Sequence, residues 1–489
     1  MKFNNVLVYI EPWIENSKPA WKKDYIWWFG ELINQLNLHS LEEIDTKFLV
    51  GDDVAHYWEE NINCNADIIV ISQCELKSIF PDYTNALKSW LSKKHTDEKL
   101  SSMSNVIKSK LGEFTPDVIF TITPVPFLAS LYQKSLILHR DALYCREPWP
   151  DELTCFDPCG INIHSIINTL ASELNCLKND YVSDEFVNEI RNGLLHDVKE
   201  NNLYIEKIAL FRDKFKKLIL LPLQSNGHYN FYCATEFNNQ FDYLYYVLMS
   251  VPRNFGVIVT NHPDDKTLNE ITITYLEKTF ANFIYIKDFE SHHSPSQFIL
   301  PHVDSLVCVS SGLCYQAMIW EKPVYLVGES PFSKLFRNLK ELSVDSCFEN
   351  VNYSAILMWL LTHYFASYTY IKNGKWLTNY IKNFLLEKET KNIKLSSFTM
   401  IDSNENILKD LILRKRKIRT FKPELEKETS TTELNAVTLN NLKNDYTSAI
   451  NELQHYKKAY KEAILVQDSL KSDIENLKCR GLFSRIFNW

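Results

Sequence analysis

Short apolar runs alternate with amphipathic segments through the first four-fifths of the chain. In the first half, the amphipathic segments 23–36 and 127–133 have helical spacing. Apolar runs typical of buried strands cover residues 6–10, 66–71, 116–121 and 135–139. Strands that alternate with helices predict an α/β fold with largely parallel sheets.

A second α/β series follows a polar stretch. Residues 179–216 are rich in charged and amide side chains with helical spacing, and we interpret them as a bridge between two domains. Beyond them, strands are predicted at 217–223, 256–260, 283–286, 305–309 and 324–327, and helices at 239–251, 267–279 and 313–320. Ser294 is expected to cap a further helix, with Pro295 in its first turn.

The composition changes after residue 388. Residues 411–419 form a basic amphipathic patch, and from residue 439 to 477 apolar residues follow an alternating three–four spacing that only Gln467 interrupts. This spacing predicts a coiled coil, with a helix lying on its own domain as the alternative. The last eleven residues combine arginine with aromatic residues and suit a membrane interface, a partner, or burial against the chain itself. The sequence therefore predicts five parts: a first domain (1–205), a second domain (206–388), a basic and polar linker (389–436), a coiled coil (437–478) and an aromatic-basic tail (479–489).

Charge and composition exclude several classes of protein. With 45% hydrophobic residues, the 489-residue chain has enough apolar side chains for sizeable cores, and a net charge of −8 argues against nucleic-acid binding. The eleven cysteines form no CxxC pair, and Cys155, Cys159 and His164 lack a fourth ligand, so no metal site is expected. No signal sequence and no apolar run of about 18 residues is found, which predicts a cytoplasmic protein.

Two strand ends carry small or polar residues suited to an anion. Ser310, Ser311 and Gly312 follow the strand at 305–309 and precede a helix, where hydroxyls and backbone N–H groups favour a phosphate or carboxylate. His262 and Pro263 end the strand at 256–260. Because the carboxyl ends of parallel strands meet at one edge of a sheet, both turns should converge on a single ligand crevice.

Acidic residues gather in the stretch 146–165, which its proline and turn residues predict to be a loop over the cleft. Glu147 and Asp157 are the carboxylates that we select for acid–base or nucleophilic work, beside Asp151 and Glu152. A transfer that retains anomeric configuration by double displacement requires a second carboxylate as nucleophile. Asp157 equally suits an Asx turn before Pro158.

Further polar residues close other strands. Gln224, His228 and Asn230 follow the strand at 217–223 and are expected to reach a sugar or an acceptor, with His228 also a catalytic candidate. Glu11 ends the first strand and is expected on the acceptor side. The triplet at 139–141 has the letters of a kinase catalytic motif, but no glycine-rich loop accompanies it, and that reading is rejected.

These motifs resemble those of a known group of enzymes. His262-Pro263 followed by Ser310-Ser311-Gly312 is similar to the His-Pro and Ser-Ser motifs of GT-B transferases that use CMP-activated nonulosonates, such as bacterial sialyltransferases and 3-deoxy-manno-octulosonate (Kdo) transferases. In those enzymes His and Ser contact the CMP phosphate, which implies that role for His262, Ser310 and Ser311. The stretches 148–160 and 221–224 also resemble segments of capsule-polysaccharide synthesis proteins.

The resemblance implies a GT-B fold, in which two Rossmann-like domains face a cleft, with the C-terminal coiled coil as an addition. It implies a metal-independent glycosyltransferase that moves Kdo or another nonulosonate from a CMP-sugar onto a bacterial surface polysaccharide. The expected partners are the nucleotide sugar, a glycan or lipid-linked acceptor, a second copy or partner transferase through the coiled coil, and the inner-membrane surface, without nucleic acid or cofactor.

The Asp nucleophile of the family has no counterpart at 225–230, which leaves Glu147, Asp157 or Asp264 as candidates for that role.

Two alternative functions stay open. A nucleotide-sugar epimerase of GT-B type would share the Ser-Ser-Gly turn but need no acceptor. A non-catalytic scaffold would assemble a polysaccharide complex through residues 439–477.

Overall fold

A computed structural model describes most of the chain up to residue 398. The described ranges are 3–13, 20–40, 43–55, 64–143, 153–178, 181–199, 203–226, 229–263, 265–342, 351–372, 374–390 and 393–398. They all fall within one compact unit, residues 1–421. The predicted linker beyond residue 398, the coiled coil and the aromatic tail lie outside the described residues, so those predictions stay predictions. None of the described helices is both long and apolar enough to cross a membrane.

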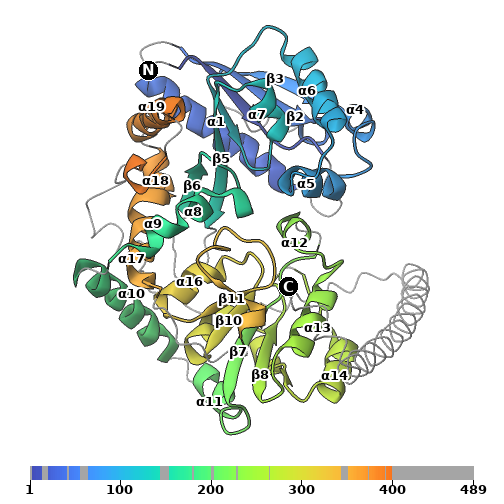
Figure 1. Cartoon of the computed structure of the whole chain (residues 1–489), viewed down its shortest axis with the longest axis vertical. Coiled ribbons are helices and arrows are strands. Elements are labelled where there is room, and N and C mark those ends of the chain that lie inside the picture. The colour runs from blue at the N-terminus through green and yellow to red at the C-terminus, as the bar shows by residue number, and fades with distance from the viewer. Residues whose placement is uncertain are drawn as a thin grey trace, which may run out of the picture. The chain divides into compact units, whose positions relative to one another are not determined.

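The first domain, in the upper part of Figure 1, is built on a sheet whose strands include β2, β3 and β5. Over the described residues this sheet has seven strands, in the order β13-β6-β5-β4-β1-β2-β3. Its parallel strands are β1 (Asn5–Tyr9), β2 (Asp45–Gly51), β3 (Asp67–Ile71), β4 (Val118–Thr121) and β5 (Leu136–Leu143). Two antiparallel strands, β6 (Leu153–Asp157) and β13 (Ala366–Ser367), extend one edge. The chain runs from β1 to β3 in one direction and from β4 to β6 in the other, which is the Rossmann-like pattern.

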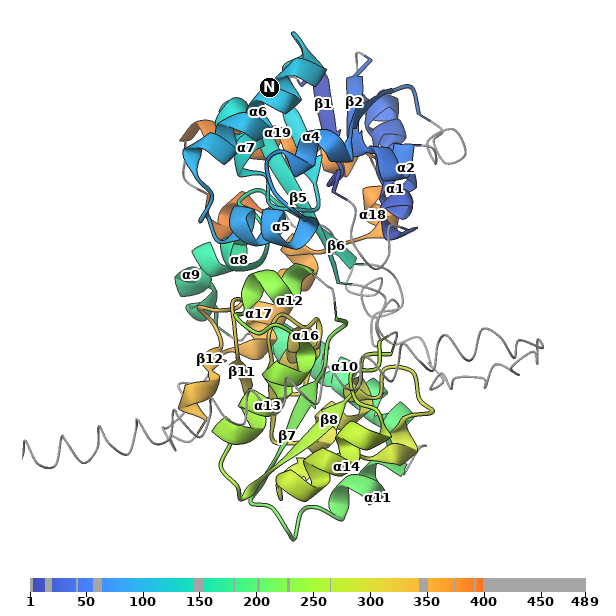
Figure 2. The same ribbon diagram turned by 90° about the vertical axis from the view of Figure 1, so that its right-hand side faces the viewer.

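Helices lie on both faces of this sheet (Figure 2). Alternate residues of its strands pack against the helices on opposite faces. Val6, Val8 and Phe120 join a core with α1 (Ala20–His39), whereas Leu7 and Ile119 join a core that includes residues of three further helices. Those helices are α5 (Tyr83–Leu91), α6 (Asp97–Leu111) and α7 (Pro126–Leu131). Between β3 and α5 lies the short α4 (Gln73–Lys77). Both faces are therefore covered, which explains why the strands are apolar almost throughout.

Side-chain caps set where several of these helices begin. The Asp82 carboxylate accepts a hydrogen bond from the Asn85 N–H at 2.9 Å, and the Thr96 hydroxyl accepts one from the Lys99 N–H at 3.3 Å. Such residues replace the hydrogen bonds that the first turn of a helix lacks.

The second domain holds a six-stranded parallel sheet, again over the described residues, in the order β12-β11-β10-β7-β8-β9. Its strands are β7 (Lys217–Pro222), β8 (Phe255–Thr260), β9 (Phe283–Ile284), β10 (Ser305–Cys308), β11 (Val324–Leu326) and β12 (Arg337–Asn338). The direction of winding reverses between β7 and β10. The connections that leave these two neighbours therefore diverge, and a crevice opens at their carboxyl ends.

Helices cover both faces of the second sheet as well. On one face, α13 (Gln240–Ser250) and α14 (Glu270–Thr279) pack on Ile219, Val257 and Val307. On the other, α16 (Leu313–Ile319) packs on Leu220 and Leu306. Two Rossmann-like domains in sequence confirm the predicted GT-B fold.

Two groups of helices connect the domains. The predicted bridge consists of α10 (Tyr181–Lys199) and α11 (Leu203–Ala209). After the second sheet, α17 (Tyr353–Trp359) and a π-helical turn (Leu360–Tyr364) lead back to β13, α18 (Tyr368–Ile371) and α19 (Gly374–Thr390). Since β13 pairs with β6 and α19 packs on α1, the last part of the predicted domain 206–388 lies on the first domain. That predicted limit is wrong because periodicity identifies an element but not the sheet that it joins.

Three other local predictions differ from the structure. The stretch 146–165, predicted as a loop, contains the buried strand β6, because the apolar and β-branched residues at 153–156 pair with β5. Strand β2 was not predicted, since Asp45 and Lys47 interrupt its apolar pattern. The helix expected to begin after Ser294 is α15 (Ser296–Ile299), whose cap is Pro295.

A substitution at the start of α19 tests how the returning segment packs. A Cβ atom on Gly374 would overlap the carbonyl oxygen of Gln35 in α1, and a backbone atom within a helix has little room to move. We expect Gly374→Ala to lower the free energy of unfolding by about 1–3 kcal/mol, measured by urea denaturation. Lys375→Ala, at the exposed neighbouring position, is the control and should stay near wild type. Equal stability of the two variants would contradict this packing.

Candidate functional site

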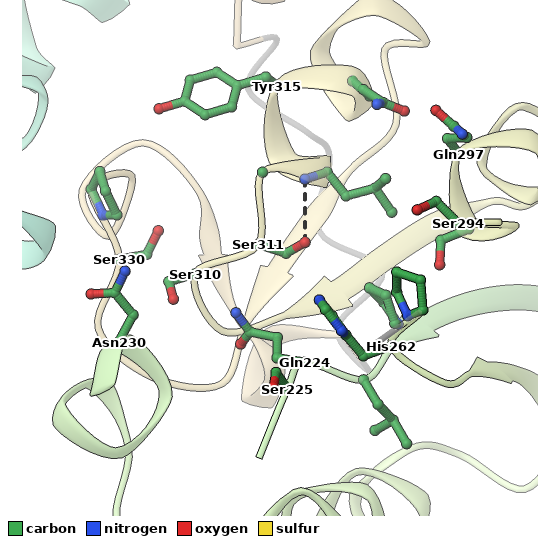
Figure 3. Close-up of a pocket in the computed structure, with 18 of the residues that line it drawn as sticks. Gln224, Ser225, Asn230, His262, Ser294, Gln297, Ser310, Ser311, Tyr315 and Ser330 are labelled. Carbon is green, nitrogen blue, oxygen red and sulfur yellow. Dashed lines mark hydrogen bonds between the residues drawn. The ribbon is translucent and has the colours of Figure 1, made fainter. Parts of the chain in front are cut away.

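A cavity of about 180 Å³ lies at the carboxyl ends of β7, β8 and β10 (Figure 3). Most of its wall comes from the loops that follow these strands, as the change in winding direction requires. Seven of the predicted site residues line it: Gln224, Asn230, His262, Pro263, Ser310, Ser311 and Gly312. In Figure 3, Asn230 lies on one side and His262 on the other, with Gln224 and Ser310 between them. The predicted convergence of the two turns is therefore confirmed.

The loop after β7 is held in place by its neighbours. The Gln224 N–H donates to the Gln240 side-chain oxygen at 2.9 Å, and the Asn226 N–H donates to the Asp265 carboxylate at 2.5 Å. The side-chain oxygen of Gln224 is buried and has no hydrogen-bond partner within the described part of the chain. A ligand donor at that oxygen would remove the cost of leaving it unsatisfied.

The loop that carries His262 is fixed by Asn261. The Leu268 N–H donates to the Asn261 side-chain oxygen at 2.8 Å, and the Asn261 amide donates back to the Leu268 carbonyl at 3.0 Å. The same amide donates to the Tyr285 hydroxyl at 3.1 Å. These bonds close the turn after β8 and place His262 and Pro263 on the cavity wall.

The Ser-Ser-Gly turn uses its polar groups unevenly. The Ser311 hydroxyl accepts from the Leu313 N–H at 3.2 Å, drawn as a dashed line in Figure 3, and the Cys314 N–H donates to the Ser311 carbonyl. The N–H groups at positions 313 and 314 are therefore engaged inside the turn, which differs from the predicted open helix N-terminus. The hydroxyl of Ser310, by contrast, is buried without a partner in the described residues. Of the two serine hydroxyls, that of Ser310 is the one that the turn itself leaves unsatisfied.

Asp141 is a wall residue that the sequence did not identify as functional. It belongs to β5 of the first domain, and it is the only carboxylate among the described lining residues. Asp141 and Tyr315 of α16 line the same cavity, and burial together with the Asp141 charge raises the pKa of the Tyr315 phenol. The sequence feature that could have identified Asp141 is its position just after the predicted strand 135–139, because the other candidate residues also follow predicted strands.

Asp157, a predicted catalytic residue, lies away from the described wall of the cavity. It is 2% exposed, and its carboxylate accepts hydrogen bonds from the N–H groups of Cys159, Gly160 and Ile166 and from two hydroxyls, at 2.7–3.1 Å. Burial raises its pKa above the ordinary value, and these donors oppose that shift. The bonds to residues 159 and 160 are those of the alternative Asx turn. The other candidates, Glu147, His228 and Asp264, lie outside the described residues.

Glu11, predicted on the acceptor side, is 1% exposed and does not reach the described cavity wall. Its carboxyl group accepts from the Thr123 hydroxyl at 3.2 Å and from the Tyr9 hydroxyl and Trp13 N–H at 3.4 Å. Burial raises the pKa of Glu11 from 4.5 to about 7, although the nearby Lys22 ammonium acts in the opposite direction. This group therefore titrates near neutral pH inside the first domain.

Comparison with known protein families finds a match to the part of the chain that contains most of the second sheet. Residues 184–335 match a family model described as capsule polysaccharide biosynthesis protein. Through this segment the chain resembles the capsule polysaccharide biosynthesis proteins. The segment contains all five predicted donor-binding residues, and the predicted resemblance is confirmed over this range. No curated protein matches the chain.

Several solved structures are similar in outline. One is KpsC of Thermosulfurimonas dismutans, a beta Kdo 2,7 transferase, with 12% identity, a TM-score of 0.35, and coverage of 79% of this chain and 100% of that one. The beta Kdo 2,4 transferase structure of the same protein has 14% identity, a TM-score of 0.29, and coverage of 49% and 79%. The UDP-GlcNAc 2-epimerase of Neisseria meningitidis has 15% identity, a TM-score of 0.23, and coverage of 84% and 99%. The fold assignment rests on the strand orders above.

Glu11 gives a pH prediction. Because its pKa is higher in the folded state, the folded protein keeps a proton that the unfolded chain releases between about pH 4.5 and 7. Its contribution to stability is full below pH 4.5 and is lost as the pH rises through 7, a total of up to about 3 kcal/mol. Glu11→Gln should therefore flatten the pH dependence of the free energy of unfolding in this range.

Urea denaturation at several pH values between 4.5 and 8 measures this effect. The control is Glu98→Gln, at an exposed position in the first turn of α6, which should keep the wild-type slope. A Glu11→Gln slope equal to that of wild type would show that Glu11 is not the group responsible.

Proposed function

We propose that this protein is a glycosyltransferase of capsule polysaccharide biosynthesis that transfers a nonulosonate such as Kdo from a CMP-linked donor. One observation carries the proposal: the five predicted donor residues come from two separate βα turns and line one cavity. All five lie within the segment that matches the capsule family. The acceptor would be a growing surface glycan.

His262 and Ser310 are the proposed contacts of the donor phosphate. His262 lines the cavity beside the loop after β7, and an imidazole there can donate a hydrogen bond or a proton to the leaving phosphate. The Ser310 hydroxyl, which is unsatisfied in the described protein, would gain its missing partner from a phosphate oxygen.

The charge of the cavity favours a donor with a single phosphate. Among its described lining residues, none is Lys or Arg, and the acidic and basic side chains are Asp141 and His262. A nucleoside diphosphate sugar brings two adjacent negative charges, and burying them without a cation or a metal is costly. A CMP-nonulosonate also carries two negative charges, but one is on the phosphate and the other on the sugar carboxylate, so they are not adjacent phosphate charges. Its leaving phosphate brings one charge, which neutral hydroxyls and one histidine suit better.

Asp141 is the proposed base. In a direct displacement, its carboxylate takes the proton of the acceptor hydroxyl, the acceptor oxygen bonds to the anomeric carbon, and the bond from that carbon to the phosphate breaks. CMP then leaves with the bonding electrons. The placement of Asp141 on the first domain supports this role, since the donor contacts come from the second domain. The catalytic roles predicted for Glu147 and His228 stay predictions.

Substitution of His262 tests the donor site. We expect CMP to raise the melting temperature of the wild type and His262→Ala to bind CMP about tenfold or more weakly, because a hydrogen bond to a charged group is lost. The measurement is a thermal-shift titration with CMP, UDP and GDP. His39→Ala, at the exposed end of α1, is the matched control and should bind like wild type.

The titration, together with a turnover assay, distinguishes the nonulosonate transferase from the epimerase and the non-catalytic scaffold. Stabilisation by UDP or GDP in place of CMP would contradict the nonulosonate donor, and turnover of a UDP-sugar without acceptor would identify an epimerase. No stabilisation by any nucleotide would favour the non-catalytic scaffold.

Substitution of Asp141 tests the chemistry. Asp141→Asn keeps the size of the side chain but removes the base, so CMP release from CMP-Kdo with acceptor should fall by about 100-fold or more. The thermal shift by CMP should remain. Asp213→Asn, at an exposed position after α11, is the control for loss of one carboxylate and should keep full turnover. Unchanged turnover in Asp141→Asn would exclude Asp141 as the base.

A further inference from the structure

Ser294 has a backbone conformation that is unfavourable for its residue type. Its φ is +54°, in the left-handed region where L-residues with a Cβ atom are strained and glycine is preferred. The next residue is Pro295, whose ring restricts the residue before it still further and favours extended conformations there. A serine at this position therefore makes folding less favourable than a glycine would.

The structure holds both sides of Ser294 firmly. Before it, the Tyr204 ring stacks on Phe289 at 4.3 Å between ring centroids, and the Tyr204 hydroxyl lies 2.6 Å from Nδ1 of His292. After it, the Ser296 hydroxyl lies 2.7 Å from the Thr260 hydroxyl at the end of β8. The chain between these anchors must turn within a few residues, and this constraint keeps Ser294 in its strained state.

The strained residue lies on the wall of the cavity. Ser294 and His262 both line it, and Figure 3 draws them on the same side. The hydroxyl of Ser294 lies 3.2 Å from Nδ1 of His293, so one hydrogen-bond position of the serine oxygen is already defined. A glycine would relieve the strain here but would present no hydroxyl to the cavity.

We propose that Ser294 binds the nucleotide part of the donor, with its hydroxyl hydrogen-bonded to a polar group of CMP. The strained backbone is then the consequence of placing that hydroxyl in the cavity. This inference rests on the proposed function, because it takes CMP as the ligand.

A second strained residue provides a comparison. Lys93 has a φ of +55° in the turn after α5, is exposed, and does not line the cavity. Strain at Lys93 has no connection with a ligand, so Lys93→Gly reports the effect of relieving strain alone.

Three variants separate the backbone from the hydroxyl. Ser294→Gly should raise the melting temperature without ligand and weaken CMP binding about tenfold, the loss of one hydrogen bond. Ser294→Ala keeps the strain and removes the hydroxyl, so it should melt like wild type and bind CMP as weakly as Ser294→Gly. Lys93→Gly should raise the melting temperature and bind CMP like wild type.

The results distinguish this inference from the proposed function. If His262→Ala loses CMP binding while both Ser294 variants bind CMP like wild type, the role of Ser294 is overturned and the donor site stands. If the wild type binds no CMP, both fall. A Ser294→Gly variant that binds weakly beside a Ser294→Ala variant that binds normally would assign the effect to the backbone and overturn the role of the hydroxyl.

Discussion

Strand β7 pairs in parallel with β8 on one side and with β10 on the other, and the candidate site depends on this arrangement. The loops that follow these strands leave the sheet at the same edge. The chain continues from β7 toward β9 and from β10 toward β12, so the connections after β7 and β10 lead in opposite directions. A space remains between them that no connection crosses. Many of the residues that line the space come from the loops that begin at positions 222, 261 and 310. These loops are close because the hydrogen bonds of the sheet hold their strands in register.

The first domain contributes to this site through a network centred on Asp157. Its carboxylate accepts a hydrogen bond from the Tyr364 hydroxyl at 2.8 Å, and β6 pairs with β13, so the returning segment is fixed to the first sheet. Asn168, from the helix that follows, donates to the carbonyl of the cavity residue Ser330 at 2.8 Å. One buried carboxylate thus helps to hold the wall to which both domains contribute. In this arrangement Asp157 accepts hydrogen bonds that hold neighbouring segments together, and its predicted catalytic role stays a prediction.

Three energetically unfavourable features lie on the wall of the cavity. The Ser310 hydroxyl and the Gln224 side-chain oxygen are buried without partners in the described residues, and Ser294 carries a strained φ. Each lowers the stability of the ligand-free protein, and each can be offset by a bound polar ligand.

The sequence by itself determined the α/β class, most of the strands, and the two turns at His262 and Ser310, because apolar periodicity and turn residues are local properties that a parallel sheet converts directly into structure. Tertiary structure decided the rest. Asp157 and Glu11 stand at strand ends like the other candidates, yet burial and the donors around them place both inside the first domain. Asp141 lies within β5 and lines the cavity, β13 joins the first sheet rather than the second, and α19 packs on α1. These outcomes depend on contacts between residues far apart in the chain, and the local pattern of apolar and polar positions carries no information about which distant partner a side chain will meet.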